Sequence, residues 1–440
     1  MLYNITLIAG IFLIVFSVYG LEVKRWSIGR IYPLTAAILC SLYVYIIPAL
    51  KAPDEVIHFY STFYASMHWS LKDVAYTVPA LLFRVGMLAG KDNSVILGTF
   101  GNVVLFVLLT GYAIRKLPFG KRTLYIICLL PITLQQAASL SYDGPVIAAV
   151  IVITSLSLRW KYLPDPVYPH KKLRLLDGSA YITNRATISE VIIFAAMCLI
   201  LINTKGGAYA PICLMPVVLF INVHWFKGGR AKIFVAALIA VIILGMVWLL
   251  CGNGGATIAN FLLTVPYIAE RGLYAYPPIY YLIDPHLFFE RIVNTFSRDG
   301  RLFIYELFGG ILGSLDIFTW NPGVHALFWL FVISLIRRDD EHRYITVARR
   351  IVILIMAAIP DIIAILAMLF YWTPIDANVI EGIQGRYFLP TLFLVSVGLG
   401  YWKKPAIHSE FIKRHEDTVL AVLTLFFTIA MSLSAITFKA

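Results

Sequence analysis

The stretch IVILIMAAIPDIIAILAMLFYW, residues 351–372, decides the fold class. It carries one charged side chain, Asp361, and is long enough to cross the roughly 30 Å hydrocarbon core of a bilayer as an α-helix. Similar apolar runs recur along the chain, so we predict an all-α, polytopic helical membrane protein. About twelve spans are expected, at residues 4–21, 31–50, 94–114, 123–140, 145–158, 189–204, 208–224, 233–250, 320–336, 351–372, 387–402 and 418–437.

The composition excludes the main soluble classes. Hydrophobic residues make up 60% of the 440 residues and charged residues only 14%, whereas soluble proteins average about 25% charged residues. A soluble enzyme, a disordered chain and a nucleic-acid-binding domain are therefore not expected. The apolar start lacks a basic segment and a cleavage site, so it is predicted as a span and not a signal peptide. Without a linker or an internal repeat, residues 1–440 are expected to form one transmembrane domain.

The charges predict an orientation. If the loop at residues 21–30 is cytoplasmic, 25 of the 36 lysines and arginines fall on the inner side and 13 of the 24 acids on the outer side. This is the distribution that the positive-inside rule expects. Two outer segments are long, residues 51–93 and 251–319, and long loops often carry function. The five cysteines lie in or beside apolar runs without metal-ligand spacing, which indicates small buried side chains.

The first outer loop opens with PDEVIHF at residues 53–59. Proline and two acids suit the first turn of a helix, which is expected to lie at the membrane surface. Asp54 and His58 are then neighbours on one face. These residues are either an ordinary helix start or a functional pair, in which an acid and an imidazole act as a base with its orienting partner or hold a divalent metal together with Glu55. Two adjacent acids beside an apolar bundle favour function.

Three further segments on the predicted outer side carry candidate residues. Tyr142 and Asp143 precede a Gly-Pro turn, which either directs them into a cavity or is only a polar turn. Arg386 lies at a span entrance between Gln384 and Tyr387, and its rigid fork suits phosphate oxygens, although an arginine here also anchors a helix at the interface. Lys205, before two glycines, is a second candidate for the same phosphate.

The second outer loop is expected to hold two interfacial helices. Asp284 and Pro285 suit the start of a helix through about Thr295, followed by a polar break at residues 297–301 and an apolar segment at 302–312. The break contains Arg298, a further candidate phosphate ligand. Asp316, which follows glycines that allow close backbone approach, is a candidate substrate contact.

Several of these segments resemble known membrane proteins. The motif at residues 53–59 resembles the Asp-Glu motif in the first outer loop of protein O-mannosyltransferases, and a similar early acidic motif marks other membrane glycosyltransferases of the GT-C superfamily. QQAASLSYD at 135–143, GSLD at 313–316 and GIQGRYFLP at 382–390 resemble a large, poorly characterised bacterial membrane-protein family of that kind. The resemblance spans about residues 50 to 390, and its last segment is the most specific.

The resemblance implies a GT-C-like fold in which Asp54, with Glu55 beside it, is the catalytic acid/base or part of a metal site. In better-known members this acid follows the first span, whereas here it follows the second. An additional N-terminal span at residues 4–21 accounts for the difference.

The expected function is transfer of a sugar from a polyprenyl-phosphate donor to an acceptor glycan or lipid-linked glycan, with inversion, on the extracytoplasmic face of the cell membrane. The outer face lacks nucleotide sugars, so the resemblance implies a lipid-borne donor. Asp54 would accept the acceptor's proton, oriented by Glu55 or His58, while Arg386, with Lys205 or Arg298, neutralises the leaving phosphate. Membrane lipids are expected partners and nucleic acid is not.

Three other functions remain open. A transporter would place ionisable residues near mid-membrane, where Asp361 and Gln135 lie, but the two related halves typical of transporters are not seen. A polysaccharide polymerase or ligase would also have long outer loops and arginines. A structural partner of a cell-envelope complex is the third alternative.

Overall fold

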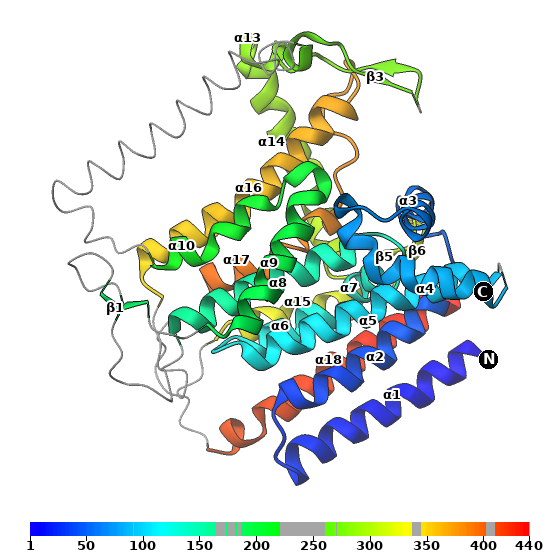
Figure 1. The fold of residues 1–440 in the computed structure, drawn as a ribbon, viewed down its shortest axis with the longest axis vertical. Coiled ribbons are helices and arrows are strands. Elements are labelled where there is room, and N and C mark those ends of the chain that lie inside the picture. Colours follow the sequence, from blue (N-terminus) through cyan, green and yellow to red (C-terminus); the bar gives the residue numbers. More distant parts are fainter. Residues whose placement is uncertain are drawn as a thin grey trace.

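The computed structural model describes residues 1–90, 92–162, 173–174, 181–182, 186–220, 260–269, 271–336, 345–401 and 410–439. Figure 1 shows that most of these residues form helices that lie side by side in a slanted bundle. Helix α1 begins and α18 ends at the same end of the bundle (Figure 1). The elements in chain order are α1 (Leu2–Val18), η1 (Tyr19–Val23), α2 (Ile28–Ile46), α3 (Glu55–Met67), η2 (Leu71–Tyr76), α4 (Thr77–Leu88), α5 (Asp92–Lys116), α6 (Lys121–Leu129), α7 (Pro131–Ala137), α8 (Asp143–Tyr162), β1 (Leu173–Arg174), β2 (Tyr181–Ile182), α9 (Ile188–Asn203), η3 (Lys205–Gly207), η4 (Ala210–Leu214), α10 (Met215–Phe220), β3 (Tyr267–Ile268), β4 (Leu273–Tyr274), α13 (Tyr280–Ile283), α14 (Pro285–Leu307), β5 (Ile311–Leu312), β6 (Ile317–Phe318), α15 (Asn321–Ser334), α16 (Val347–Tyr371), η6 (Gly385–Phe388), α17 (Leu392–Leu399) and α18 (Glu410–Lys439).

The all-α membrane class is confirmed, because helices dominate the described residues and six of them are long and apolar enough to cross a membrane. The candidate spans are Leu2–Val23, Ile28–Ile46, Asn93–Lys116, Asp143–Tyr162, Val347–Tyr371 and Arg414–Phe438. Within the described ranges, six short strands form three antiparallel pairs, β1 with β2, β3 with β4 and β5 with β6.

The prediction of twelve full spans is not confirmed. The expected span at 123–140 is two helices, since Leu130 is extended and Pro131 starts a new helix; the residue before a proline is disfavoured in helical conformation. Residues 387–402 contain the end of η6 and the eight-residue helix α17. Three further apolar helices are shorter than a span: Ile188–Asn203, Ala210–Leu219 and Asn321–Ser334. The expected span at 233–250 lies outside the described residues.

Helix α8 lies at the centre of the bundle. In the most apolar 18-residue stretch of α8, 94% of the residues are buried. In the corresponding stretch of α16 only 22% are buried. A helix that is apolar on all sides is buried by its neighbours, and α5, α9 and α10 pack against α8. The start of α8 therefore brings Asp143 to the middle of one end of the bundle.

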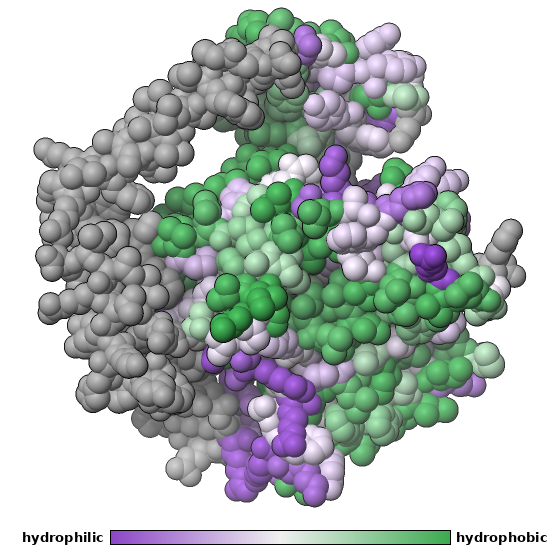
Figure 2. Space-filling view, in the orientation of Figure 1, coloured by the Kyte–Doolittle hydropathy of each residue, from purple (hydrophilic) through white to green (hydrophobic). Residues whose placement is uncertain are grey.

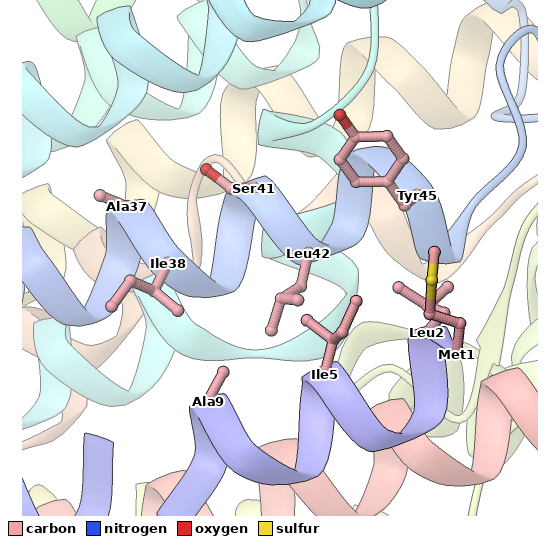
Figure 3. Close-up of a pocket in the computed structure, with 9 residues that line it drawn as sticks. All are labelled: Met1, Leu2, Ile5, Ala9, Ala37, Ile38, Ser41, Leu42 and Tyr45. Carbon is pink, nitrogen blue, oxygen red and sulfur yellow. The ribbon is translucent and has the colours of Figure 1, made fainter. Parts of the chain in front are cut away.

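Hydrophobic side chains cover much of the described face of the bundle, and hydrophilic ones gather toward its lower edge (Figure 2). Between α1 and α2 lies an apolar groove of about 680 Å³, across which Ile5 and Leu42 point toward one another (Figure 3). Ser41 and Tyr45 supply the hydroxyl groups among its lining residues. None of the side chains that line this groove carries a charge.

The two long loops are more regular than predicted. The helix expected after Pro53 is confirmed as α3, but it is followed by η2 and α4, which the sequence did not indicate. In the second loop the predicted break at 297–301 is wrong, because α14 runs unbroken through it. The predicted cap of α14 is confirmed, since the Asp284 carboxylate accepts the Leu287 N–H at 3.2 Å.

Glycine contacts join α4 to α5. A Cβ atom on Gly101 would lie 2.7 Å from the Cα atom of Pro79, and one on Gly86 would lie 2.5 Å from the Cα atom of Ser94. Such distances leave no room for a side chain, and small residues are the usual means by which membrane helices approach closely. The pair holds α4, the last helix of the first loop, against α5.

We expect Gly101→Val to destabilise the protein by about 1–3 kcal/mol, as overpacking of a tight contact does. The unfolding midpoint in detergent measures the effect. Gly300→Ala in α14 is the matched control, because no atom lies within 4 Å of its added methyl group; it should stabilise the helix by about 0.5–1 kcal/mol. Equal midpoints for the two variants would contradict the close α4–α5 contact.

Candidate functional site

Four charged side chains from distant segments meet at one end of the bundle. Arg386 in η6 places Nη2 2.7 Å from Oδ2 of Asp54, just before α3, and Nη1 3.2 Å from Oδ2 of Asp143, at the start of α8. The Nζ atom of Lys205, at the start of η3, lies 2.7 Å from Oδ1 of Asp143. We call these four residues the charge cluster. The two positive charges of this cluster equal its two negative charges in number.

The cluster is buried at its centre and open on one side. The side chains of Arg386 and Asp143 are 5% and 8% exposed, Lys205 is 22% exposed, and Asp54 is 57% exposed. Buried charges are costly unless they are paired and hydrogen-bonded, and each buried member here has a partner of opposite sign. A ligand would therefore reach the cluster past Asp54.

Polar and aromatic neighbours fix the two cations. Arg386 donates from Nε to Oε1 of Gln384 at 2.6 Å, and its guanidinium carbon lies 5.2 Å from the centre of the Tyr387 ring. The Lys205 ammonium lies 5.4–6.0 Å from the ring centres of Tyr142, Tyr209 and Tyr387. Aromatic faces attract cations at such distances, so the ammonium is held between rings and the Asp143 carboxylate.

Tyr209 was missed by the sequence reasoning. Its hydroxyl donates to the backbone carbonyl of Tyr387 at 3.2 Å, which ties the segment after η3 to η6. Its position four residues after Lys205, beyond two glycines, was the available signal.

Glu55 points away from the cluster and connects two loops. Its carboxylate accepts the Ala52 N–H at 3.1 Å through Oε2 and the Leu140 N–H at 3.0 Å through Oε1. Burial raises the pKa of Glu55, although these backbone donors oppose the shift. The loop that carries Asp54 is thereby fastened to the turn that carries Asp143. The geometry favours a positioning role for Glu55.

The side chain of His58 is hydrogen-bonded to a residue other than Asp54. Its Nδ1 lies 2.6 Å from the Tyr76 hydroxyl, and its ring meets the Tyr142 ring edge-on with centres 4.5 Å apart. Burial lowers the pKa of His58, which favours the neutral ring. Because Glu55 and His58 are hydrogen-bonded to other segments, their positions do not favour the alternative in which they hold a metal ion together with Asp54. Across the described part of the chain, no three His, Cys, Asp or Glu side chains are arranged to hold a metal ion.

Glu306, near the end of α14, is a second residue that the sequence reasoning missed. Its Oε2 accepts the Gly385 N–H at 2.6 Å and so holds the turn that carries Arg386. A Cβ atom on Gly385 would lie 2.7 Å from the Cβ atom of Glu306, so only glycine fits against α14 there. Glu306 is the single charged residue in the apolar run at 302–312, and that isolation was the signal.

We expect the stability of the protein to depend on the pH through Glu306. Burial raises the pKa of Glu306 from its ordinary 4.5, so its contribution to stability is complete below pH 4.5 and is lost as the pH rises through the raised value. Glu306→Gln keeps the acceptor oxygen without the charge. The unfolding midpoint of the wild type should therefore fall relative to that of the variant above pH 4.5. A gap that stays constant from low to neutral pH would contradict this expectation.

Two further predicted site residues, Arg298 and Asp316, also lie away from the charge cluster. Arg298 is on the exposed face of α14, where its Nη2 lies 2.7 Å from Oδ2 of Asp299. Asp316 lies in the β5–β6 turn, whose Gly313 exchanges hydrogen bonds with Gln135 at 2.8 and 3.2 Å. The Ser314 hydroxyl donates to the carbonyl of Lys51 at 2.7 Å, so this turn braces the first loop.

Helices of membrane-spanning length and apolarity define a multi-pass membrane protein. An arginine, a lysine and two carboxylates form a charged site at one end of its bundle. The chain belongs to the family described as Predicted membrane protein (DUF2142), which matches residues 62–395. The matched region contains Asp143, Lys205 and Arg386 and begins after Asp54. Comparisons with curated proteins and with solved structures found no match.

Proposed function

We propose that the protein is a membrane glycosyltransferase that moves a sugar from a polyprenyl-phosphate donor to a hydroxyl group of an acceptor glycan or glycolipid. The observation that carries the proposal is the contact between Asp54 and Arg386. It places an accessible carboxylate beside a buried guanidinium. A carboxylate can take a proton from a hydroxyl group, and a guanidinium suits phosphate oxygens.

The proposed step needs no further reactant. The acceptor oxygen bonds to the anomeric carbon while its proton passes to Asp54, and the bond from that carbon to the phosphate oxygen breaks. The electron pair leaves with the polyprenyl phosphate, whose added negative charge Arg386 and Lys205 neutralise. Fixed charges aimed at a developing anion are typically worth several kcal/mol to a reaction. Direct displacement inverts the anomeric carbon.

The site is proposed to face the extracytoplasmic side of the cell membrane. Asp54 follows the C-terminal end of α2, and Asp143 starts α8. The distribution of lysine and arginine along the sequence supports an outer location for both residues. There the donor's isoprenoid chain would remain in the bilayer while its phosphate reaches the ends of the helices.

The proposal is tested with purified protein in proteoliposomes that contain radiolabelled polyprenyl-phosphate hexoses or pentoses and a lipid-linked glycan acceptor. We expect labelled acceptor in samples with protein and none in empty liposomes. Absence of product with every sugar, together with accumulation of free sugar inside sealed vesicles, would reject the enzyme in favour of a transporter. Against that rival, Asp361 in α16 accepts the Thr391 hydroxyl at 2.9 Å, a contact that gives this acid a structural partner.

A further inference from the structure

Three side chains accept hydrogen bonds from Arg386, namely Asp143, Gln384 and Asp54, and they differ in how strongly the surrounding structure holds them. Asp143 is buried and lies against Arg386 through one oxygen and Lys205 through the other. Gln384 is only two residues from Arg386 along the chain. The side chain of Asp54, by contrast, is more than half exposed. Among the described residues its carboxylate forms one ion pair, with Arg386. Asp54 is therefore the acceptor that can leave most easily.

The backbone at Asp54 does not depend on that ion pair. Asp54 has φ 61° and ψ 3°, a left-handed conformation that aspartate and asparagine tolerate better than most residues. The carbonyl of Asp54 accepts the N–H groups of Ile57 and His58, at 3.0 and 3.2 Å. The neighbouring Glu55 fastens the loop through Ala52 and Leu140. The carboxylate can swing away while these bonds remain.

We infer that Asp54 occupies, in the unliganded protein, the position on Arg386 that a phosphate oxygen of the donor takes when it binds. This inference rests on the proposed function. Exchange of one carboxylate for one singly charged phosphodiester leaves the buried cluster neutral, whereas an additional charge would remain uncompensated. The displaced Asp54 is then free to take the acceptor's proton. Binding of the donor thereby releases the base.

The exchange also specifies the class of donor. Asp143 is buried between the two cations and has no route to solvent comparable to that of Asp54, so only one carboxylate can be replaced. A phosphodiester with one negative charge, such as a prenyl-phosphate sugar, matches this exchange. A prenyl diphosphate carries more charge than the departing carboxylate and is disfavoured.

The inference is tested by binding in nanodiscs at constant ionic strength, with geranyl methyl phosphate as the singly charged diester and geranyl diphosphate as the competitor class. Asp54→Asn removes the competing charge but keeps the backbone conformation. It should bind the diester about two- to fivefold more tightly than the wild type, as expected for loss of a partly exposed ion pair. Asp54→Gly, which also suits the left-handed conformation, should tighten binding similarly.

Glu290→Gln is the matched control, since it removes an exposed acid on α14, 3.7 Å from His286; its affinity for the diester should equal that of the wild type. Unchanged affinity in both Asp54 variants, or tighter binding of the diphosphate than of the diester to the wild type, would overturn the inference and leave the proposed function standing. Tighter binding in the variants without sugar transfer by the wild type would uphold the exchange and reject the transferase. No binding of either probe by any form would reject both.

Discussion

Asp54→Asn is expected to lower the rate of sugar transfer by about 10²- to 10⁴-fold, the usual contribution of a general base. The amide cannot take the acceptor's proton, although it fits the same left-handed backbone position. The rate is measured in proteoliposomes under single-turnover conditions, so that slow release of product does not mask the chemical step. Donor binding should remain at least as tight as in the wild type.

The control for this prediction is again Glu290→Gln, which loses one negative charge from the same predicted side of the membrane and should keep the wild-type rate. If Asp54→Asn transferred sugar at the wild-type rate, Asp54 would have no part in the chemistry. Loss of donor binding together with activity would instead assign Asp54 to the binding of the donor.

Arg386→Ala is expected to have the largest effect on stability, about 3–5 kcal/mol, as found when one partner of a buried ion pair is removed. Arg386 is 5% exposed and is paired with two carboxylates, one of them, Asp143, almost fully buried. Without the guanidinium, Lys205 is the cationic partner that Asp143 keeps among the described residues. The shift of the unfolding midpoint in detergent measures the loss.

Two further variants locate the cause of that loss. The double variant Arg386→Ala/Asp143→Asn should recover part of the stability, because it removes the buried charge that the single variant leaves behind. Arg298→Ala is the matched control, since this arginine is 59% exposed and its pair with Asp299 lies on the surface; its effect should stay below about 1 kcal/mol. Similar losses for Arg298→Ala and Arg386→Ala would contradict the central role of the buried pair.

Arg386→Lys separates charge from geometry. Lysine keeps the positive charge but lacks the planar fork that reaches Asp54, Asp143 and Gln384 at once. The protein should therefore fold, while the affinity for geranyl methyl phosphate falls.

The sequence by itself determined the class of the protein and several local starts of helices. Long apolar runs leave few options, because a backbone inside a bilayer must satisfy its own hydrogen bonds. The start of α3 and the cap at Asp284 were predictable for a different reason. Both features depend on residues within one helical turn.

Only the tertiary structure decided how the charged residues meet. Asp54 and Arg386 are 332 residues apart in the chain, and their contact depends on the packing of α2, α8, α14 and η6 around them. The partners of Glu55 and His58 likewise come from other segments, Leu140 and Tyr76, so local spacing suggested a shared site that the fold does not form. Tertiary structure also decided the extent of α14. Its polar residues at 297–301 predicted a break in the helix but lie within one continuous helix. Local sequence patterns indicate which side chains are able to form pairs. The packing of helices that are distant in the sequence determines which of these pairs form.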